Sequence, residues 1–199
     1  MAPVCNGKSA LRRIQAVKAI KPWKLLETSH LTSVEPWFQI FREKVALPSG
    51  RVLDDFYRIV TPEFAMVVPI TSAGELLMVR GYKHGPRKVC LSAPGGMIEA
   101  GESPLKAAQR ELLEETGHEA SEWLSLGEFT VDSNRQGGTA HIFMARDLRQ
   151  IASRKQDDAE ELQVELLPPG DFSEAIRKGE IVTLATVAAV ALAMLNLTK

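Results

Sequence analysis

The sequence predicts a mixed α/β domain in which helices pack on a central sheet. Runs of strand type fill the chain from Trp23 to Tyr82, and the period becomes helical between Gly101 and Gly117. No repeat, low-complexity tract or long polar linker divides the chain after about residue 22. With 199 residues, of which 45% are hydrophobic, the chain can bury a core without disulfides or a metal.

Turn residues separate the expected strands. Pro48-Ser49-Gly50, Thr61-Pro62 and Ser72-Ala73-Gly74 lie between apolar runs, and such residues favour turns over strands. In chain order, the expected strands are 37–47, 51–60, 64–70, 75–80, 128–131, 140–145 and 164–167.

The central helix is bounded by its own sequence. Ser103 is a good N-cap, Pro104 suits the first helical position, and Gly117 suits the residue just beyond the end. At about 100° per residue, one stripe can face the sheet. This stripe consists of Leu105, Ala108, Leu112 and Thr116.

Further helices are expected near both ends. Ser9 can cap a short amphipathic helix, and two more are predicted over 171–178 and 183–195, the last capped by Thr183. Residues 181–197 carry no charge, but they fall short of the roughly 20 apolar residues of a membrane span. A buried terminal helix is therefore favoured, and no membrane partner is expected.

Composition excludes several classes of function. The 24 Lys and Arg residues against 25 Asp and Glu argue against a strongly basic nucleic-acid binder. Cys5 and Cys90 cannot form a disulfide framework, so a reducing, cytoplasmic location is expected. The four histidines have no metal-ligand spacing, and no serine-hydrolase elbow or Walker A loop occurs.

An acidic cluster on the central helix carries the chemistry. Glu111, Glu114 and Glu115 fall within an arc of roughly 100°, where like charges repel one another. Hard carboxylate oxygens beside the flexible Gly95-Gly96 loop suit Mg²⁺ or Mn²⁺ far better than zinc. Arg110, one turn before Glu114, can hold that carboxylate through an ion pair.

The spacing of these residues resembles the Nudix box. Gly96, Glu102 and the run Arg110-Glu111-Leu112-Leu113-Glu114-Glu115-Thr116-Gly117 match G-x5-E-x7-R-E-U-x-E-E-x-G-U, in which U is aliphatic. The departure is His118 at the final aliphatic position. The resemblance implies an α/β/α sandwich around a mixed sheet, with an N-terminal strand extension at 1–60 and a Nudix catalytic domain at 61–199.

The resemblance also implies a reaction and its metal site. Nudix proteins typically hydrolyse a diphosphate bond in a nucleoside diphosphate linked to another group. By similarity, Glu111, Glu115 and Glu114 would bind Mg²⁺ or Mn²⁺ with the Gly95 carbonyl, and Glu102 would brace the loop. A general base could come from the box or from the acidic stretch at 157–161, where Asp158 and Glu160 are candidates and a solvated charge run is the alternative.

Segments outside the box resemble the ADP-ribose pyrophosphatase subgroup. Residues 36–38, 57–59, 78–85 and 93–96 follow its layout, which implies a homodimer joined through the N-terminal strands. The resemblance suggests aromatic stacking on the base and contacts to phosphate or base, although each residue also fits an ordinary core, edge-strand or hairpin role. The candidate substrate contacts are Trp37, Phe38, Arg80, Lys83, Gly96 and Arg135.

Two departures leave the substrate open. No proline lies between Pro104 and Pro168, although nucleotide-sugar members carry one after the box, and Ser92 stands where relatives carry Glu. ADP-ribose or a related nucleoside diphosphate sugar is the first hypothesis. The alternatives are another nucleotide, such as a nucleoside triphosphate or dinucleotide, and a nucleotide-sensing module without catalysis.

Overall fold

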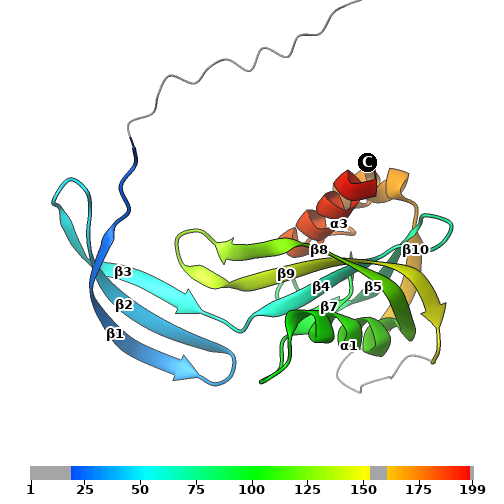
Figure 1. Ribbon diagram of the computed structural model, residues 1–199, viewed down its shortest axis with the longest axis horizontal. Helices are drawn as coiled ribbons and strands as arrows, with labels where there is room; N and C mark the ends of the chain where they lie inside the picture. The colour runs from blue at the N-terminus through cyan, green and yellow to red at the C-terminus, as the bar shows by residue number, and fades with distance from the viewer. Residues whose placement is uncertain (1–18, 153–160, 198–199) are drawn as a thin grey trace, which may run out of the picture.

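The computed structural model describes residues 19–152 and 161–197. Figure 1 shows a layered body and a long arm of paired strands that extends from it. The arm comprises residues 19–60 with β1 (Lys24–Val34), β2 (Phe38–Ala46) and β3 (Val52–Val60), and residues 61–152 and 161–197 form the body. The expected helix from Ser9 and the base candidates Asp158 and Glu160 lie outside the described residues.

Two sheets organise the chain. The larger sheet has seven strands in the order β1-β2-β3-β9-β4-β7, and β8 pairs with β9. β9 runs parallel to β4 and antiparallel to β8, so this sheet is mixed. The smaller sheet has the order β10-β5-β6. The body strands are β4 (Phe64–Pro69), β5 (Leu76–Lys83), β6 (Lys88–Ser92), β7 (Gly95–Met97), β8 (His118–Asp132), β9 (Gln136–Gln150) and β10 (Leu162–Leu167).

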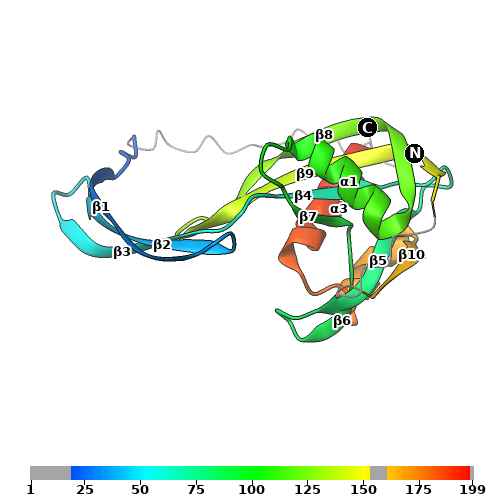
Figure 2. The same cartoon turned by 90° about the horizontal axis from the view of Figure 1, so that it is seen from below.

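Helices cover both faces of the part of the larger sheet that lies in the body, as Figure 2 shows. Ala65 and Val67 of β4 pack on α1 (Pro104–Thr116), and the alternate residues Met66 and Val68 belong to the core beneath α3 (Leu184–Leu197). This alternation follows from the two-residue period of a strand whose faces are both buried. A 3₁₀ turn (Pro169–Asp171) and α2 (Phe172–Arg177) precede α3. The α/β sandwich expected from the sequence is confirmed.

Several elements differ from the prediction. β8 and β9 have 15 residues each and extend well beyond the expected 128–131 and 140–145. β6 and β7 were not expected: β6 forms a hairpin with its neighbour β5, and the short β7 pairs with the distant β4. Leu105 was expected to face the sheet, which is wrong: it lies in the first turn of α1 and is 38% exposed. None of the described helices is long and apolar enough to cross a membrane.

Candidate active site

The ends of α1 are formed by the residues that its sequence favours. The Ser103 hydroxyl accepts the Lys106 N–H at 3.4 Å, which satisfies one free donor of the first turn. Gly117 adopts the left-handed conformation with φ of 74°, and its N–H donates to the Leu113 carbonyl at 2.8 Å. α1 is therefore fixed in length, and its acidic residues have a defined position.

Two glycines allow β7 to fit between β4 and α1. A Cβ at Gly96 would come within 2.2 Å of Glu111 Oε1. Gly95 has φ of 155°, and a Cβ there would come within 2.4 Å of the Ala65 carbonyl oxygen. The Gly95 N–H donates to Glu115 Oε2 at 3.0 Å. Only glycine permits this close approach, which places two box carboxylates directly over the β7 backbone.

Arg110 gathers the carboxylates of the box. Its guanidinium donates to both oxygens of Glu102 at 3.1 and 3.0 Å, to Glu111 Oε1 at 2.7 Å and to Glu114 Oε2 at 3.2 Å. A further bond reaches the Met97 carbonyl at 3.0 Å. One guanidinium charge is thus shared by three carboxylates, and it holds the loop between β7 and α1 in place.

Protonation in this cluster follows from the same contacts. Hydrogen bonding from Arg110 lowers the pKa of Glu102, with a further contribution from the Glu99 N–H. Bonds to Glu102 and Glu111 raise the pKa of Arg110 above its ordinary value. Both residues are therefore charged at neutral pH, as a structural ion pair requires.

The chemical type of the oxygen donors in the cluster suits a divalent cation. Glu111, Glu114 and Glu115 offer hard carboxylate oxygens beside the β7 backbone, and their combined charge exceeds that of Arg110. Within residues 19–152 and 161–197, no three His, Cys, Asp or Glu side chains converge as a ready-made metal site. Glu111 turns to Arg110 and Glu115 to the Gly95 amide instead.

α3 supports the chain segment that leads into this site. The buried Thr186 hydroxyl accepts the Ala93 N–H at 3.4 Å and the Thr183 hydroxyl at 2.8 Å. The Pro94 carbonyl accepts the Val67 N–H at 3.0 Å. Sequence reasoning missed Thr186, whose only signal is a polar side chain within an uncharged apolar stretch.

The structure brings the box residues together but leaves most substrate candidates apart from them. Trp37, 62% exposed, and the half-buried Phe38 lie at the β1–β2 turn of the arm. Arg135, in the β8–β9 turn, pairs with Asp132 at 3.3 Å. Lys83 ends β5.

The Arg80 guanidinium is already paired with two carboxylates, one on β10 of the smaller sheet and one in the segment before α3. Its guanidinium donates to both oxygens of Glu165 and, at 2.9 Å, to Glu180. These bonds raise the pKa of Arg80. Its geometry is that of a brace between β5, β10 and the segment before α3.

Sequence reasoning also missed an imidazole held between two acids. His141 Nε2 lies 2.8 Å from Glu63 Oε2, and Nδ1 lies 3.9 Å from Glu128 Oε2. His141 is in register with Ala65, which is in register with Gly96, so the group lies across β4 from the box. No spacing in the sequence brings these residues together.

Comparison with known proteins gives concordant findings. The NUDIX domain model matches residues 61–185. An ADP-ribose pyrophosphatase of Mycobacterium tuberculosis is 28% identical over 82% of this chain and 78% of its own length. One of Bacillus subtilis is 27% identical over 61% of this chain, and the match spans 65% of that relative, just under two thirds. The crystal structure of an ADP compounds hydrolase superposes with a TM-score of 0.76 at 24% identity, covering 92% of this chain and 97% of that one.

Proposed function

The chain belongs to the Nudix hydrolase family, and from this premise we propose that it hydrolyses the diphosphate linkage of ADP-ribose or a related nucleoside diphosphate sugar with Mg²⁺ or Mn²⁺. The products are a nucleoside monophosphate and a sugar phosphate. The observation that carries the proposal is the gathering of the box carboxylates over the β7 glycines. Relatives named ADP-ribose pyrophosphatase support the substrate class.

The metal ligands of the proposal are the carboxylates of Glu111, Glu114 and Glu115 with the Gly95 carbonyl. When bound, a divalent cation neutralises the bridging phosphates and lowers the pKa of a water. The protein itself holds these carboxylate oxygens in position. Gly96 leaves room for Glu111, and the Gly95 N–H orients Glu115. Arg110 holds the loop, and its charge keeps the acidic side chains together.

The remaining roles divide between body and arm. Glu114, whose side chain is 43% exposed, is suited to a proton-accepting role at the edge of the cluster. Asp158 and Glu160 remain the alternative candidates for the general base. Trp37 and Phe38 supply aromatic surface for stacking of the nucleobase, Lys83 contacts phosphate, Arg135 contacts phosphate or nucleobase, and Gly96 belongs to the substrate-binding loop. Arg80 could bind a phosphate only by exchanging Glu165 and Glu180 for it.

We also propose a homodimer joined through the arm, with residues 1–60 as the dimerising extension of a catalytic domain at 61–199. Large apolar side chains of the arm are exposed in the single chain: Leu25 by 55%, Leu31 by 49% and Trp37 by 62%. Exposed apolar area of this kind marks an association surface. Analytical ultracentrifugation tests this, since a monomer at micromolar concentration would refute it.

A substrate panel tests the activity. ADP-ribose, other nucleoside diphosphate sugars, dinucleotides and nucleoside triphosphates are incubated with Mg²⁺ or Mn²⁺, and the phosphate products are separated by chromatography. We expect AMP and ribose 5-phosphate from ADP-ribose. The Glu115→Gln variant should be inactive and the Glu119→Gln variant, at an exposed position on β8, fully active. Binding of ADP-ribose without cleavage would overturn the proposal in favour of a sensing module.

A further inference from the structure

Arg58 of β3 joins the arm to the body. Its Nε donates to Glu43 Oε1 on β2 at 2.7 Å, and its Nη1 donates to Gln136 Oε1 on β9 at 2.8 Å. The guanidinium carbon also lies 4.8 Å from the centre of the Phe41 ring. One planar group on β3 thus contacts its neighbouring arm strand β2 and the first residue of the central body strand β9, a geometry that the fork of arginine allows.

Glu43 makes the Arg58 contact costly to lose. Glu43 is 8% exposed, although it lies on an arm strand that no described helix packs against. A carboxylate removed from water in this way requires a paired cation or hydrogen-bond donors. Arg58 supplies both, so its orientation is fixed from the arm side and its second nitrogen is directed at the body.

The body side of the contact is equally constrained. Gln136 has φ of 75°, in the left-handed region that residues other than glycine rarely adopt. The Ile59 N–H donates to the Arg135 carbonyl at 2.9 Å, and Ile59 with Gln136 forms the one registered pair between β3 and β9. A Cβ at Gly138 would lie 2.5 Å from Thr61 Oγ1, so the start of β9 packs closely on the β3–β4 connection. The seam between arm and body is therefore short.

We infer that Arg58 is a positioning residue: by bonding to both Glu43 and Gln136, it fixes the orientation of the arm relative to the body. The inference rests on the proposed function, in which the arm presents aromatic side chains to the nucleoside half of the substrate. A short seam without this bond would leave the arm free to pivot. Substrate binding would then weaken, while the chemistry at the Nudix box would continue unchanged.

Steady-state kinetics on ADP-ribose tests the inference with three variants. Arg58→Met and Gln136→Leu remove opposite ends of one bond, so each should raise KM about tenfold with kcat unchanged, the effect of a hydrogen bond to a charged group. The double variant should raise KM no further than either single one. Unchanged KM in Gln136→Leu, with a raised KM in Arg58→Met, would overturn the inference in favour of a direct substrate contact. A fall in kcat at unchanged KM would also overturn it.

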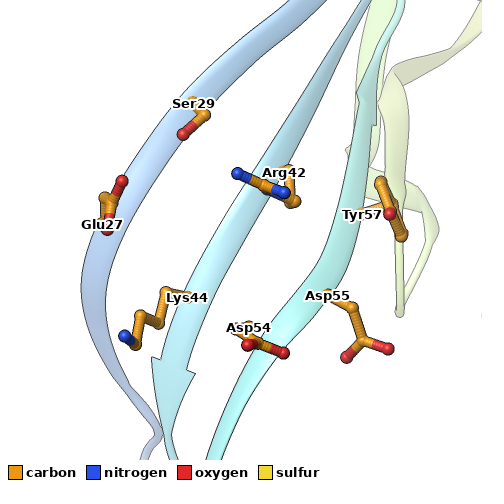
Figure 3. Close-up of a pocket in the computed structure, with 7 residues that line it drawn as sticks. All are labelled: Glu27, Ser29, Arg42, Lys44, Asp54, Asp55 and Tyr57. Carbon is orange, nitrogen blue, oxygen red and sulfur yellow. The ribbon is translucent and has the colours of Figure 1, made fainter.

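Two companions control for folding and charge. Arg58→Met/Glu43→Gln removes the buried charge together with its partner, so it tests the tether even where Arg58→Met alone fails to fold. Arg42→Met is the matched control, because Arg42 neighbours Glu43 on the opposite, solvent-facing side of β2. Figure 3 shows that side, where Arg42 and Lys44 lie among Glu27, Ser29, Asp54, Asp55 and Tyr57 around a cavity of about 320 Å³.

Amide hydrogen exchange provides a readout that needs no turnover. In Arg58→Met, the Ile59 amide, which bonds across the seam, should exchange about tenfold faster, and the Val67 amide within the body should not change. This result would stand even if ADP-ribose were not the substrate, so failure of the proposed function and failure of the tether are separable. Equal exchange at Ile59 in Arg58→Met and in Arg42→Met would refute the tether.

Discussion

The body and the arm share the larger sheet, yet they are stabilised differently. In the body, β4 buries successive side chains beneath α1 and α3, and Ala65, Val67 and Val68 are fully buried. In the arm, strand pairing and side-chain contacts such as the edge-to-face pair of Trp23 with Phe56 maintain the structure, and Trp23 remains 50% exposed. The body thus contains its own core, whereas the arm relies on its seam with the body and on association.

The largest expected effect tests whether the chemistry belongs to the body alone. Glu115→Gln keeps the shape of the side chain but removes a carboxylate charge from the cluster. Turnover of ADP-ribose should fall about 10³-fold, because metal-assisted stabilisation contributes several kcal/mol. Product release measured by chromatography checks this. Retention of activity within about tenfold of the wild type would place the essential carboxylate elsewhere.

Core substitutions should separate the two regions by stability. Leu112 of α1 is fully buried, so Leu112→Ala should lower the free energy of unfolding by about 2–5 kcal/mol. Leu25 of the arm is 55% exposed, so Leu25→Ala should change the free energy of unfolding of the monomer by no more than about 0.5 kcal/mol. Urea titrations at low protein concentration measure both values. Equal losses would contradict the distinction between body and arm.

A smaller effect is expected at the start of α1. Ser103→Ala removes the hydroxyl that accepts the Lys106 N–H, and it should cost about 1 kcal/mol of unfolding free energy. Ser103→Asp should restore most of this loss, because its carboxylate can accept the same N–H. Thermal unfolding of the wild type, Ser103→Ala and Ser103→Asp measures both the loss and its rescue. Failure of the aspartate to rescue would mean that the cap contributes little here.

The smallest effect concerns pH at the joint between the two regions. Asn134 and Arg135 backbone N–H groups donate to Asp132 and lower its pKa from the ordinary 3.8. The stabilisation is therefore fully present above pH 3.8 and is lost as pH falls through the lower folded-state pKa. The unfolding free energy of Asp132→Asn should differ from that of the wild type at neutral pH and converge with it in acid. A difference independent of pH would exclude this carboxylate as the cause.

Local signals allowed α1, the helix of the Nudix box, to be predicted closely. Ser103, Pro104 and Gly117 act within one turn of the helix ends, and the carboxylates of α1 share a face because of helical geometry alone. Elements that form only by pairing with distant strands could not be predicted from the sequence. β7 has three residues, and it is a strand only because Gly95 and Gly96 pair with Met66 and Ala65.

The roles of charged side chains were even harder to predict from the sequence, because they depend on partners that only the tertiary structure brings close. Arg80 fits a phosphate contact by its position in the sequence, but β10 brings Glu165 beside it, and the segment before α3 brings Glu180. The same holds for Arg58, whose partners Glu43 and Gln136 belong to two other strands. Charge and residue type are visible in a sequence, whereas the partner that uses the charge is not.

The parallel pairing of β4 with β9 also bears on how the molecule folds. It joins Phe64, in the first half of the chain, to Ala140, in the second half. All box residues lie between these strands, inside the loop that the pairing closes. Contacts so distant in sequence form slowly, because the entropy of closing the loop is lost before the contacts compensate for it. Refolding should therefore restore activity only with the late phase that assembles β4 and β9, even though α1 can form early.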